Sequence, residues 1–366
     1  MDWTKTKYSY EVTVNVIHQT NVDIMLGSLS GVQLDNLSIS EDYYSDSRIQ
    51  AKVTTVTETG KSDGYVENAR LRIILAIPEQ NWAQELITGY VSDLDETYES
   101  GTIVRTYTIE STIWGLMDHL LADPVIISSN ANLIDIWTGL LKSQTKMQYS
   151  VSNAQNRTFT QTILYEPGTD LATLLFEISS GYDRINVDGH GRITLEKYTA
   201  PSKRSSECVI DYNDVHNLVK APLTKASTAY EAPGRVVVTA TISYMNDNGE
   251  NDQEVIAGHY DSPASHPTSL ASRGYLRAIS ESDNGLSDYP TKDELSAYAK
   301  LIWEDEQDSG IEWSAETIYG GYYAGQIATL ILPSSLDGEM ISKKVLISSV
   351  STEFNNFIQR LTMKEV

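Results

Sequence analysis

Two imidazole side chains and a carboxylate lie close together late in the sequence, where they could bind a metal ion. They are His259, Asp261 and His266. Imidazole nitrogen and carboxylate oxygen are both ligands of zinc and other transition metals. Their spacing matches no established metal motif, and histidines in loops are more often plain surface residues. We therefore expect no metal ion at this position.

Carboxylates also gather near residue 95, in a pattern that a glycoside hydrolase could use. Asp93, Asp95, Glu96 and Glu99 could supply the paired acid and base of such an enzyme. One of the pair would need apolar surroundings that raise its pKa, and the sequence implies no such pocket. The chain has 50 Asp and Glu against 27 Lys and Arg, a net charge of −23. Neighbouring carboxylates are therefore expected from composition alone.

The acidic loop 246–252 invites comparison with a calcium-binding loop. With Gly249 at the sixth position, Tyr244 would occupy the first ligand position and Val255 the twelfth. Neither residue is a carboxylate, so the comparison fails. We predict a solvated hairpin turn instead.

Other signals exclude several classes of function. The sequence has no His-Glu-x-x-His helix, Walker loop or dinucleotide fingerprint, so we predict no enzymatic activity and no cofactor. The single cysteine, Cys208, excludes an intramolecular disulfide. Neither a membrane-spanning apolar stretch nor a secretory signal is visible, and we expect synthesis in a reducing cytoplasm. The strong negative charge disfavours specific binding of nucleic acid.

Residues 1–112 are predicted to be β structure, in a barrel or a sandwich. Short alternating segments separated by turn residues favour this class. The expected strands are 8–18 and 69–76, followed by a long hairpin of 87–95 and 103–111 across a turn at 96–101.

Residues 113–200 are predicted to form an α/β insert. We expect helices at 113–121 and 130–141 and strands at 147–152 and 158–165. Thr169 or Asp170 can cap a further helix, because a short side-chain oxygen accepts from a free amide of the first turn. A hairpin of 182–187 and 192–198 follows across a glycine-rich turn.

The rest of the chain is predicted to return to β structure. Residues 201–235 are punctuated by prolines and are expected to be a connector. The part 236–366 would begin with a strand at 235–244. A loop-rich stretch at 253–290 would come next, and then a helix at about 291–305, capped by Thr291. Strands at 312–317, 326–332, 344–351 and 357–364 would complete it. The predicted fold class is mainly β with an α+β insert.

This order of elements resembles that of phage baseplate and tail hub proteins, the gp27-like and tail-associated (Tal) N-terminal fold. The resemblance covers nearly the whole chain and rests on order, since no catalytic motif carries it. Its pieces are the hairpin 87–111 with the helix after it, the helix 130–141, and the helix and hairpin of 167–198. The segment Val215–Val219 before the strand at Val236-Val237-Val238, the helix 292–302 and the terminal strand pair complete it.

The resemblance implies two tube-like β-barrel domains, 1–112 and 236–366, that bracket a small α/β domain at 113–200. It implies a homotrimer whose barrels form a ring at the end of the tail tube, in a virion. The implied partners are the distal tail or tail tube protein, a tip, spike or fibre protein, and the tape measure protein. Genome DNA would pass through an acidic channel without specific binding, and no membrane insertion is implied.

We predict contacts with a neighbouring subunit or the tube at the hairpin tip, through Asp95, Glu96, Glu99 and Gly101. Two alternatives remain open at this point. One is a receptor- or glycan-binding tail adhesin that uses the 22 tyrosines. The other is a cell-wall hydrolase.

Overall fold

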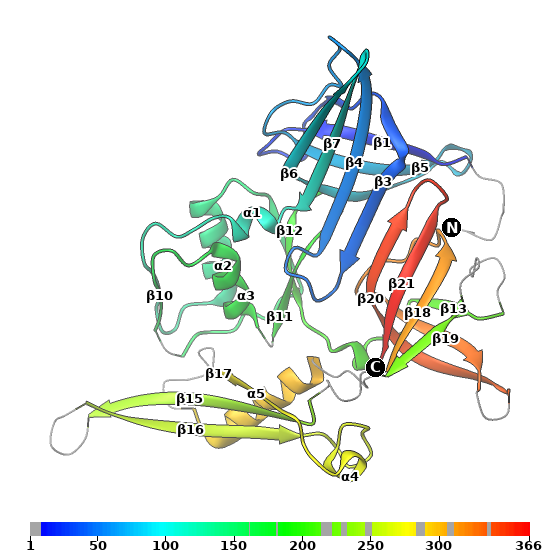
Figure 1. Cartoon of the computed structure of the whole chain (residues 1–366). Coiled ribbons are helices and arrows are strands. Elements are labelled where there is room, and N and C mark those ends of the chain that lie inside the picture. Colours follow the sequence, from blue (N-terminus) through cyan, green and yellow to red (C-terminus); the bar gives the residue numbers. More distant parts are fainter. Residues whose placement is uncertain are drawn as a thin grey trace.

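The computed structural model shows a mainly β protein with an α/β segment in the middle of the chain (Figure 1). It describes residues 9–160, 162–180, 182–213, 222–227, 233–245, 251–282, 290–305, 311–334 and 338–366. Among these residues no helix is long and apolar enough to span a membrane.

The first part of the chain is β structure, as predicted. Its elements are β1 (Glu11–Ile17), β2 (Met25–Ser28), β3 (Val32–Asp42), β4 (Ile49–Glu58), β5 (Arg70–Ile77), η1 (Pro78–Gln80), β6 (Trp82–Glu99) and β7 (Thr102–Ser111). The buried side chains of β1 and β5 face a shared core, which includes Val14, Leu71 and Ile73. The sequence analysis identified β1, β5, β6 and β7 but not β2, β3 or β4.

The β6–β7 hairpin is longer than predicted and projects from the sheet (Figure 1). Its strands stay paired as far as Glu99 and Thr102. The turn is therefore only Ser100 and Gly101, and Gly101 has a positive φ of 86° that a residue without Cβ adopts cheaply. Residues 96–99, expected in the turn, belong to the strand.

The last part of the chain contains the four predicted strands. They are β18 (Ile311–Ile318), β19 (Ile327–Pro333), β20 (Met340–Glu353) and β21 (Ile358–Glu365). Strand β20 pairs with β3, with Ser351 opposite Ser40. The first and last parts of the chain therefore belong to one 13-stranded sheet. Starting from β14 (Thr224–Ser227), its order is β14-β18-β21-β20-β3-β4-β7-β6-β5-β1-β2; β19 also pairs with β20, and β13 (Cys208–Asp211) pairs with β19.

Residues 113–200 form a separate α/β segment around their own core. Its elements are α1 (Trp114–Met117), β8 (Val125–Ile127), α2 (Leu133–Gln144), β9 (Tyr149–Ser152), β10 (Ile163–Tyr165), α3 (Leu171–Ser179), β11 (Asp183–Val187) and β12 (Ile193–Lys197). Trp137, Leu174, Leu175 and Leu195 are fully buried in this core. Asp170 caps α3 as predicted, because its side chain accepts from the Thr173 amide.

Helix α1 is shorter than the predicted helix 113–121. It ends at Met117, and Leu120 then forms a β-bridge with Asp170. The Leu121 amide donates to the Thr169 carbonyl at 2.9 Å. These tertiary hydrogen bonds replace the bonds that would have continued the helix.

Residues 201–235 contribute strands as well as a connection. They contain η2 (Pro201–Lys203), β13 (Cys208–Asp211) and β14 (Thr224–Ser227). Strand β13 pairs in parallel with β19, and β14 pairs antiparallel with β18. Pairing with distant strands defines these short segments, so local sequence did not reveal them.

The prediction of a loop-rich stretch at 253–290 was wrong. Strand β16 (Asn251–Asp261) pairs along its whole length with β15 (Arg235–Met245), and β17 (Ala278–Ser282) pairs with β15 on the other side. Short helix α4 (Leu270–Arg273) lies between β16 and β17 in the chain. The pairing confirms a hairpin around the acidic loop, although residues 246–250 lie outside the described part of the chain.

Helix α5 (Lys292–Asp305) packs on this three-stranded sheet through Leu295, Tyr298, Ala299 and Trp303. Thr291 caps it as predicted: its hydroxyl accepts from the Glu294 amide while the Glu294 carboxylate accepts from the Thr291 amide. Strand β16 was missed because the helix covers only one face, and Val255 is 66% exposed on the other.

Candidate functional site

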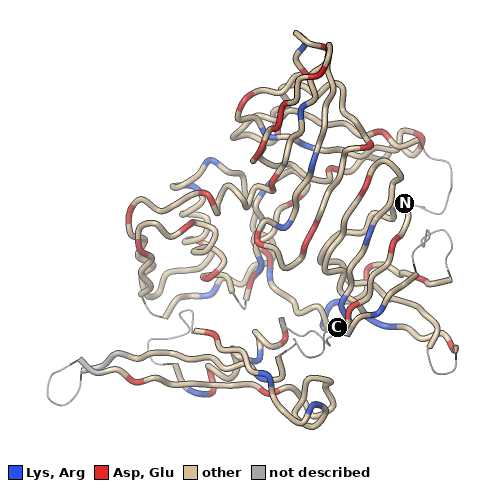
Figure 2. The backbone as a smooth tube through the Cα atoms, viewed as in Figure 1, with Lys and Arg blue, Asp and Glu red and all other residues tan. Residues whose placement is uncertain are grey.

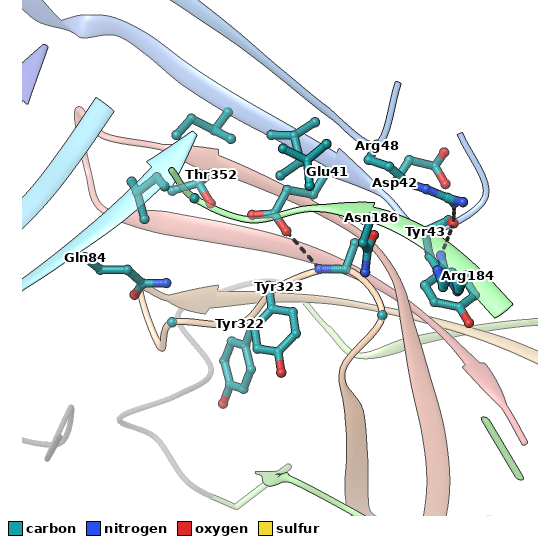
Figure 3. Close-up of a pocket in the computed structure, with 18 of the residues that line it drawn as sticks. Glu41, Asp42, Tyr43, Arg48, Gln84, Arg184, Asn186, Tyr322, Tyr323 and Thr352 are labelled. Carbon is teal, nitrogen blue, oxygen red and sulfur yellow. Dashed lines mark hydrogen bonds between the residues drawn. The ribbon is translucent and has the colours of Figure 1, made fainter. Parts of the chain in front are cut away.

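A pocket of about 530 Å³ lies where the three parts of the chain meet (Figure 3). The end of β3 contributes Glu41, the residue directly after β3 is Tyr43, and the start of β6 contributes Gln84. Arg184 lines it from β11, and Tyr322 lines it from the segment between β18 and β19. Ligand sites often form at such junctions, because rigid elements from different parts of a protein enclose a concave space there.

Glu41 is a pocket carboxylate that is largely removed from water. Its Oε2 accepts a hydrogen bond from the Ala324 amide at 3.0 Å. Burial raises the pKa of Glu41 to about 7, an effect that the amide hydrogen bond only partly opposes. Among the described residues no Lys, Arg or His forms an ion pair with it.

Two guanidinium groups, those of Arg48 and Arg184, line the pocket beside Tyr43. Arg184 donates to the Tyr43 carbonyl at 2.7 Å and lies over the Tyr43 ring, with Cζ 3.3 Å from its centroid. Arg48 donates to the same carbonyl. The Arg184 contacts fix the β11–β12 hairpin against the end of β3, whereas Arg48 belongs to the turn between β3 and β4.

A second contact holds that hairpin against β5 and β6. Thr88 donates to the Gly189 carbonyl at 2.7 Å, and Arg72 donates to Thr88 at 2.8 Å. Glu85 lies 3.1 Å from Arg72 and 2.7 Å from His190 Nδ1. Glycine is required at position 189, because a Cβ there would lie 2.3 Å from the Glu85 carbonyl oxygen. The α/β segment is therefore docked through its glycine-rich turn.

The structure places the predicted contact residues Asp95, Glu96, Glu99 and Gly101 together on the projecting end of the β6–β7 hairpin. Figure 2 shows acidic residues along this hairpin. The residues from Ser92 to Glu99 are all exposed, so this end is available to a neighbouring molecule. No described contact tests the predicted role.

Tyr98 is the most exposed large hydrophobic side chain of the hairpin, with 70% of its surface accessible. Its hydroxyl donates to Glu96 at 2.8 Å, and Arg105 donates to the same carboxylate at 2.6 Å. The Arg105 hydrogen bond is the main reason that the pKa of Glu96 lies below its usual value. This chain of bonds holds an exposed aromatic ring in place, a residue type enriched at binding hot spots.

Two of the three candidate metal ligands, Asp261 and His266, are engaged elsewhere. Asp261 forms a bidentate ion pair with Arg235, at 2.5 and 2.7 Å. His266 is hydrogen-bonded to Thr268 at 2.8 Å and packs edge-on against Trp303. No group of His, Cys, Asp and Glu in the described part of the chain is arranged to hold a metal ion.

One hydrolase-like motif was missed in the sequence analysis. Gly60-Lys61-Ser62-Asp63-Gly64 matches the Gly-x-Ser-x-Gly pattern of serine hydrolases. That motif works at a sharp turn from a strand into a helix. Here β4 ends at Glu58 and the next element is β5, so the elbow is not formed. Asp63 instead accepts from buried Thr55 and Tyr107 at 2.8 and 2.5 Å.

Comparison with solved structures shows the fold of phage tail proteins. A tail protein from Neisseria meningitidis matches with a TM-score of 0.64 and 12% identity, over 98% of this chain and 97% of that one. A 43 kDa tail protein of prophage MuSo2 from Shewanella oneidensis matches with a TM-score of 0.64 and 14% identity, over 97% and 98%.

An E. coli type VI secretion component, described as similar to the T4 tail proteins gp27 and gp5, matches with a TM-score of 0.52 and 10% identity, over 98% of this chain and 77% of that one. No family model matches the sequence, and no curated protein matches it. The hub-protein resemblance inferred from the order of elements is therefore confirmed at the level of the fold.

The pocket residues were not found from the sequence. Glu41, Arg184 and Ala324 come from three distant parts of the chain, and each occupies an ordinary position in a strand or turn. No local pattern could have brought them together, because the β3–β20 pairing and the docked hairpin create the site.

Proposed function

We propose that this chain is a structural hub of a phage tail tip or baseplate. The observation that carries the proposal is the likeness to tail proteins over nearly the full length of both chains. Because identity is low, the likeness itself concerns the fold. The proposed function rests on the share of both chains, 97% or more, that the likeness covers.

In this proposal three copies form a ring, and the β parts within 1–112 and 236–366 act as the tube-like barrels. The 113–200 segment would lie at the periphery. The sheet ends at β2 and at β14, whose outer edges have no strand partner among the described residues. Unpaired edges are aggregation hazards unless they are covered, and ring contacts between copies would cover them.

The proposed ring joins a tail tube or distal tail protein on one side to a tip, spike or fibre protein on the other, with the tape measure protein reaching it from the tube. DNA would pass through the centre. The net charge of −23 supports this, because acidic walls repel phosphates and would not retain the genome. The chain would act in the virion after synthesis in the host cytoplasm.

The end of the β6–β7 hairpin is proposed as one contact with a neighbouring copy or the tube. Asp95, Glu96, Glu99 and Gly101 lie there beside the exposed ring of Tyr98. We also propose that the chain has no catalytic role, since the hydrolase-like carboxylates lie on this open hairpin and not in an enclosed pocket.

The proposal is tested by counting the protein in the particle. Quantitative mass spectrometry of purified particles should give three copies per tail, in the same ratio to the tip protein in every preparation. Deletion of the coding sequence should leave particles without joined tail tips. Absence of the protein from wild-type particles would refute the proposal. Normal assembly of particles after the coding sequence is deleted would also refute it.

A further inference from the structure

We propose that the pocket at the junction of the three parts binds a guanidinium or ammonium group, with Glu41 as its counter-ion. The proposal does not depend on the tail-hub function. It follows from a carboxylate that is desolvated, faces a pocket and lacks a cationic partner within the described chain.

One carboxylate oxygen of Glu41 accepts a hydrogen bond from a described residue, and the other does not. Oε2 accepts from the Ala324 amide, whereas no described residue donates a hydrogen bond to Oε1. A desolvated carboxylate without a cation is costly, and its raised pKa reflects that cost. A bound cation would offset the cost through a charge-assisted hydrogen bond to Oε1.

Aromatic side chains add a second means of recognition. Tyr319, Tyr322 and Tyr323 line the same pocket as Glu41. Burial raises the pKa of Tyr319, and the charge of Glu41 adds to this shift. A cation near aromatic rings is attracted to their faces. Carboxylate and tyrosines together fit an alkyl cation better than a neutral sugar or an anion.

The other charged groups around the pocket do not supply this cation. The basic residues of the lining are Arg48, Arg184, Lys197 and Arg204. Arg48 and Arg184 both donate to the Tyr43 carbonyl. Arg204 pairs with Glu207 at 2.7 Å, and Lys197 is exposed. The remaining acids are Asp42, Glu85 and Glu196. Asp42 accepts from the Tyr44 amide at 2.8 Å, and Glu85 contacts Arg72 and His190. Glu196 is exposed to solvent. Glu41 is thus the desolvated pocket carboxylate, with neither an ion pair nor a second hydrogen bond among the described residues.

Two cationic probes test the proposal on the full chain. Agmatine represents a free small cation, and the blocked peptide acetyl-Gly-Gly-Arg-Gly-Gly-amide represents an arginine side chain of a partner protein. Isothermal titration calorimetry should detect binding of at least one of them. Agmatine alone would indicate a free ligand, and binding of the peptide would indicate a protein segment.

The variant Glu41→Gln keeps an acceptor for the Ala324 amide but removes the charge. It should bind the successful probe at least tenfold more weakly, whereas Glu254→Gln, which removes an exposed carboxylate on β16, should bind it like the wild type. With the wild-type protein, binding of the probe at pH 7 should release protons from Glu41. This release is measured as a dependence of the binding enthalpy on the ionisation enthalpy of the buffer. Failure of both probes to bind at 20 mM, equal binding by Glu41→Gln, or no proton release would overturn the proposal.

Discussion

The Glu41 carboxylate accepts a hydrogen bond from the backbone amide of Ala324, a residue 283 positions later in the chain. The contact lies beside the β3–β20 pairing, which joins the first and last parts of the chain into one sheet. A titratable group therefore contacts both parts of the chain at the place where they join. Its protonation should affect stability.

We expect Glu41→Gln to change how stability depends on pH. The pKa of Glu41 is about 7 in the folded chain against 4.5 for an ordinary glutamate. Between these values the folded state binds more protons than the unfolded state, so the free energy of unfolding falls as pH rises. Above pH 7 the wild type should be less stable than Glu41→Gln, by at most about 3 kcal/mol; near pH 4.5 the two should be equal.

Urea unfolding of both proteins between pH 4.5 and 8.5 measures this difference, with Glu254→Gln as the control for losing one negative charge. The difference between wild type and Glu41→Gln should grow with pH and level off above 7. A difference that is constant across the range would mean that Glu41 does not titrate there.

Gly189→Ala should destabilise the protein. The new methyl group would lie 2.3 Å from the Glu85 carbonyl oxygen, so the docked turn must move away from β6. Overpacking of this kind costs about 1–3 kcal/mol. Gly139→Ala in α2 is the matched control: nothing lies within 4 Å of its Cβ, and alanine should gain up to about 1 kcal/mol in a helix. Equal urea midpoints for the two variants would contradict the docking described above.

Tyr98→Ala should leave folding intact and weaken assembly. The side chain is 70% exposed, so its loss should change the free energy of unfolding by less than about 0.5 kcal/mol. If the hairpin end contacts a neighbouring copy or the tube, association should weaken at least tenfold. Light scattering over a dilution series measures this, with Tyr275→Ala, 45% exposed, as the control. Unchanged association of Tyr98→Ala would exclude this tyrosine as a contact.

The thiol of Cys208 should react slowly in the folded protein. Burial raises its pKa to about 11 from 9.0, with a smaller contribution from the charge of Glu207. Because the thiolate is the reacting species, labelling with Ellman's reagent at pH 8 should be about 100-fold slower than in guanidinium chloride. Equal rates in both conditions would show that β13 opens freely.

The sequence predicted elements wherever local chemistry specifies them. The Thr291–Glu294 capping box marks the start of α5, and Asp170 marks the start of α3. Strand β18 was found because buried residues such as Trp313 and Ala315 alternate with partly exposed ones. In each case the signal lies within a few residues of the element.

Elements that depend on distant partners were missed. Strand β16 has exposed residues such as Gln253 and Val255 where an apolar pattern would be expected, and β13 and β14 exist through pairing with β19 and β18. The pocket around Glu41 follows the same rule, since three segments far apart in sequence create it. The elements that were missed are those that depend on long-range pairing, which no local pattern encodes.

The proposed hub function is tested most directly by the solution mass of the purified chain, followed by negative-stain averaging of the same peak. The proposal predicts three times the 40.7 kDa chain mass and a six-lobed ring with a central hole. A compact particle with two-fold symmetry, or a monomer at every concentration that stays single when the tail tube protein is added, would contradict it.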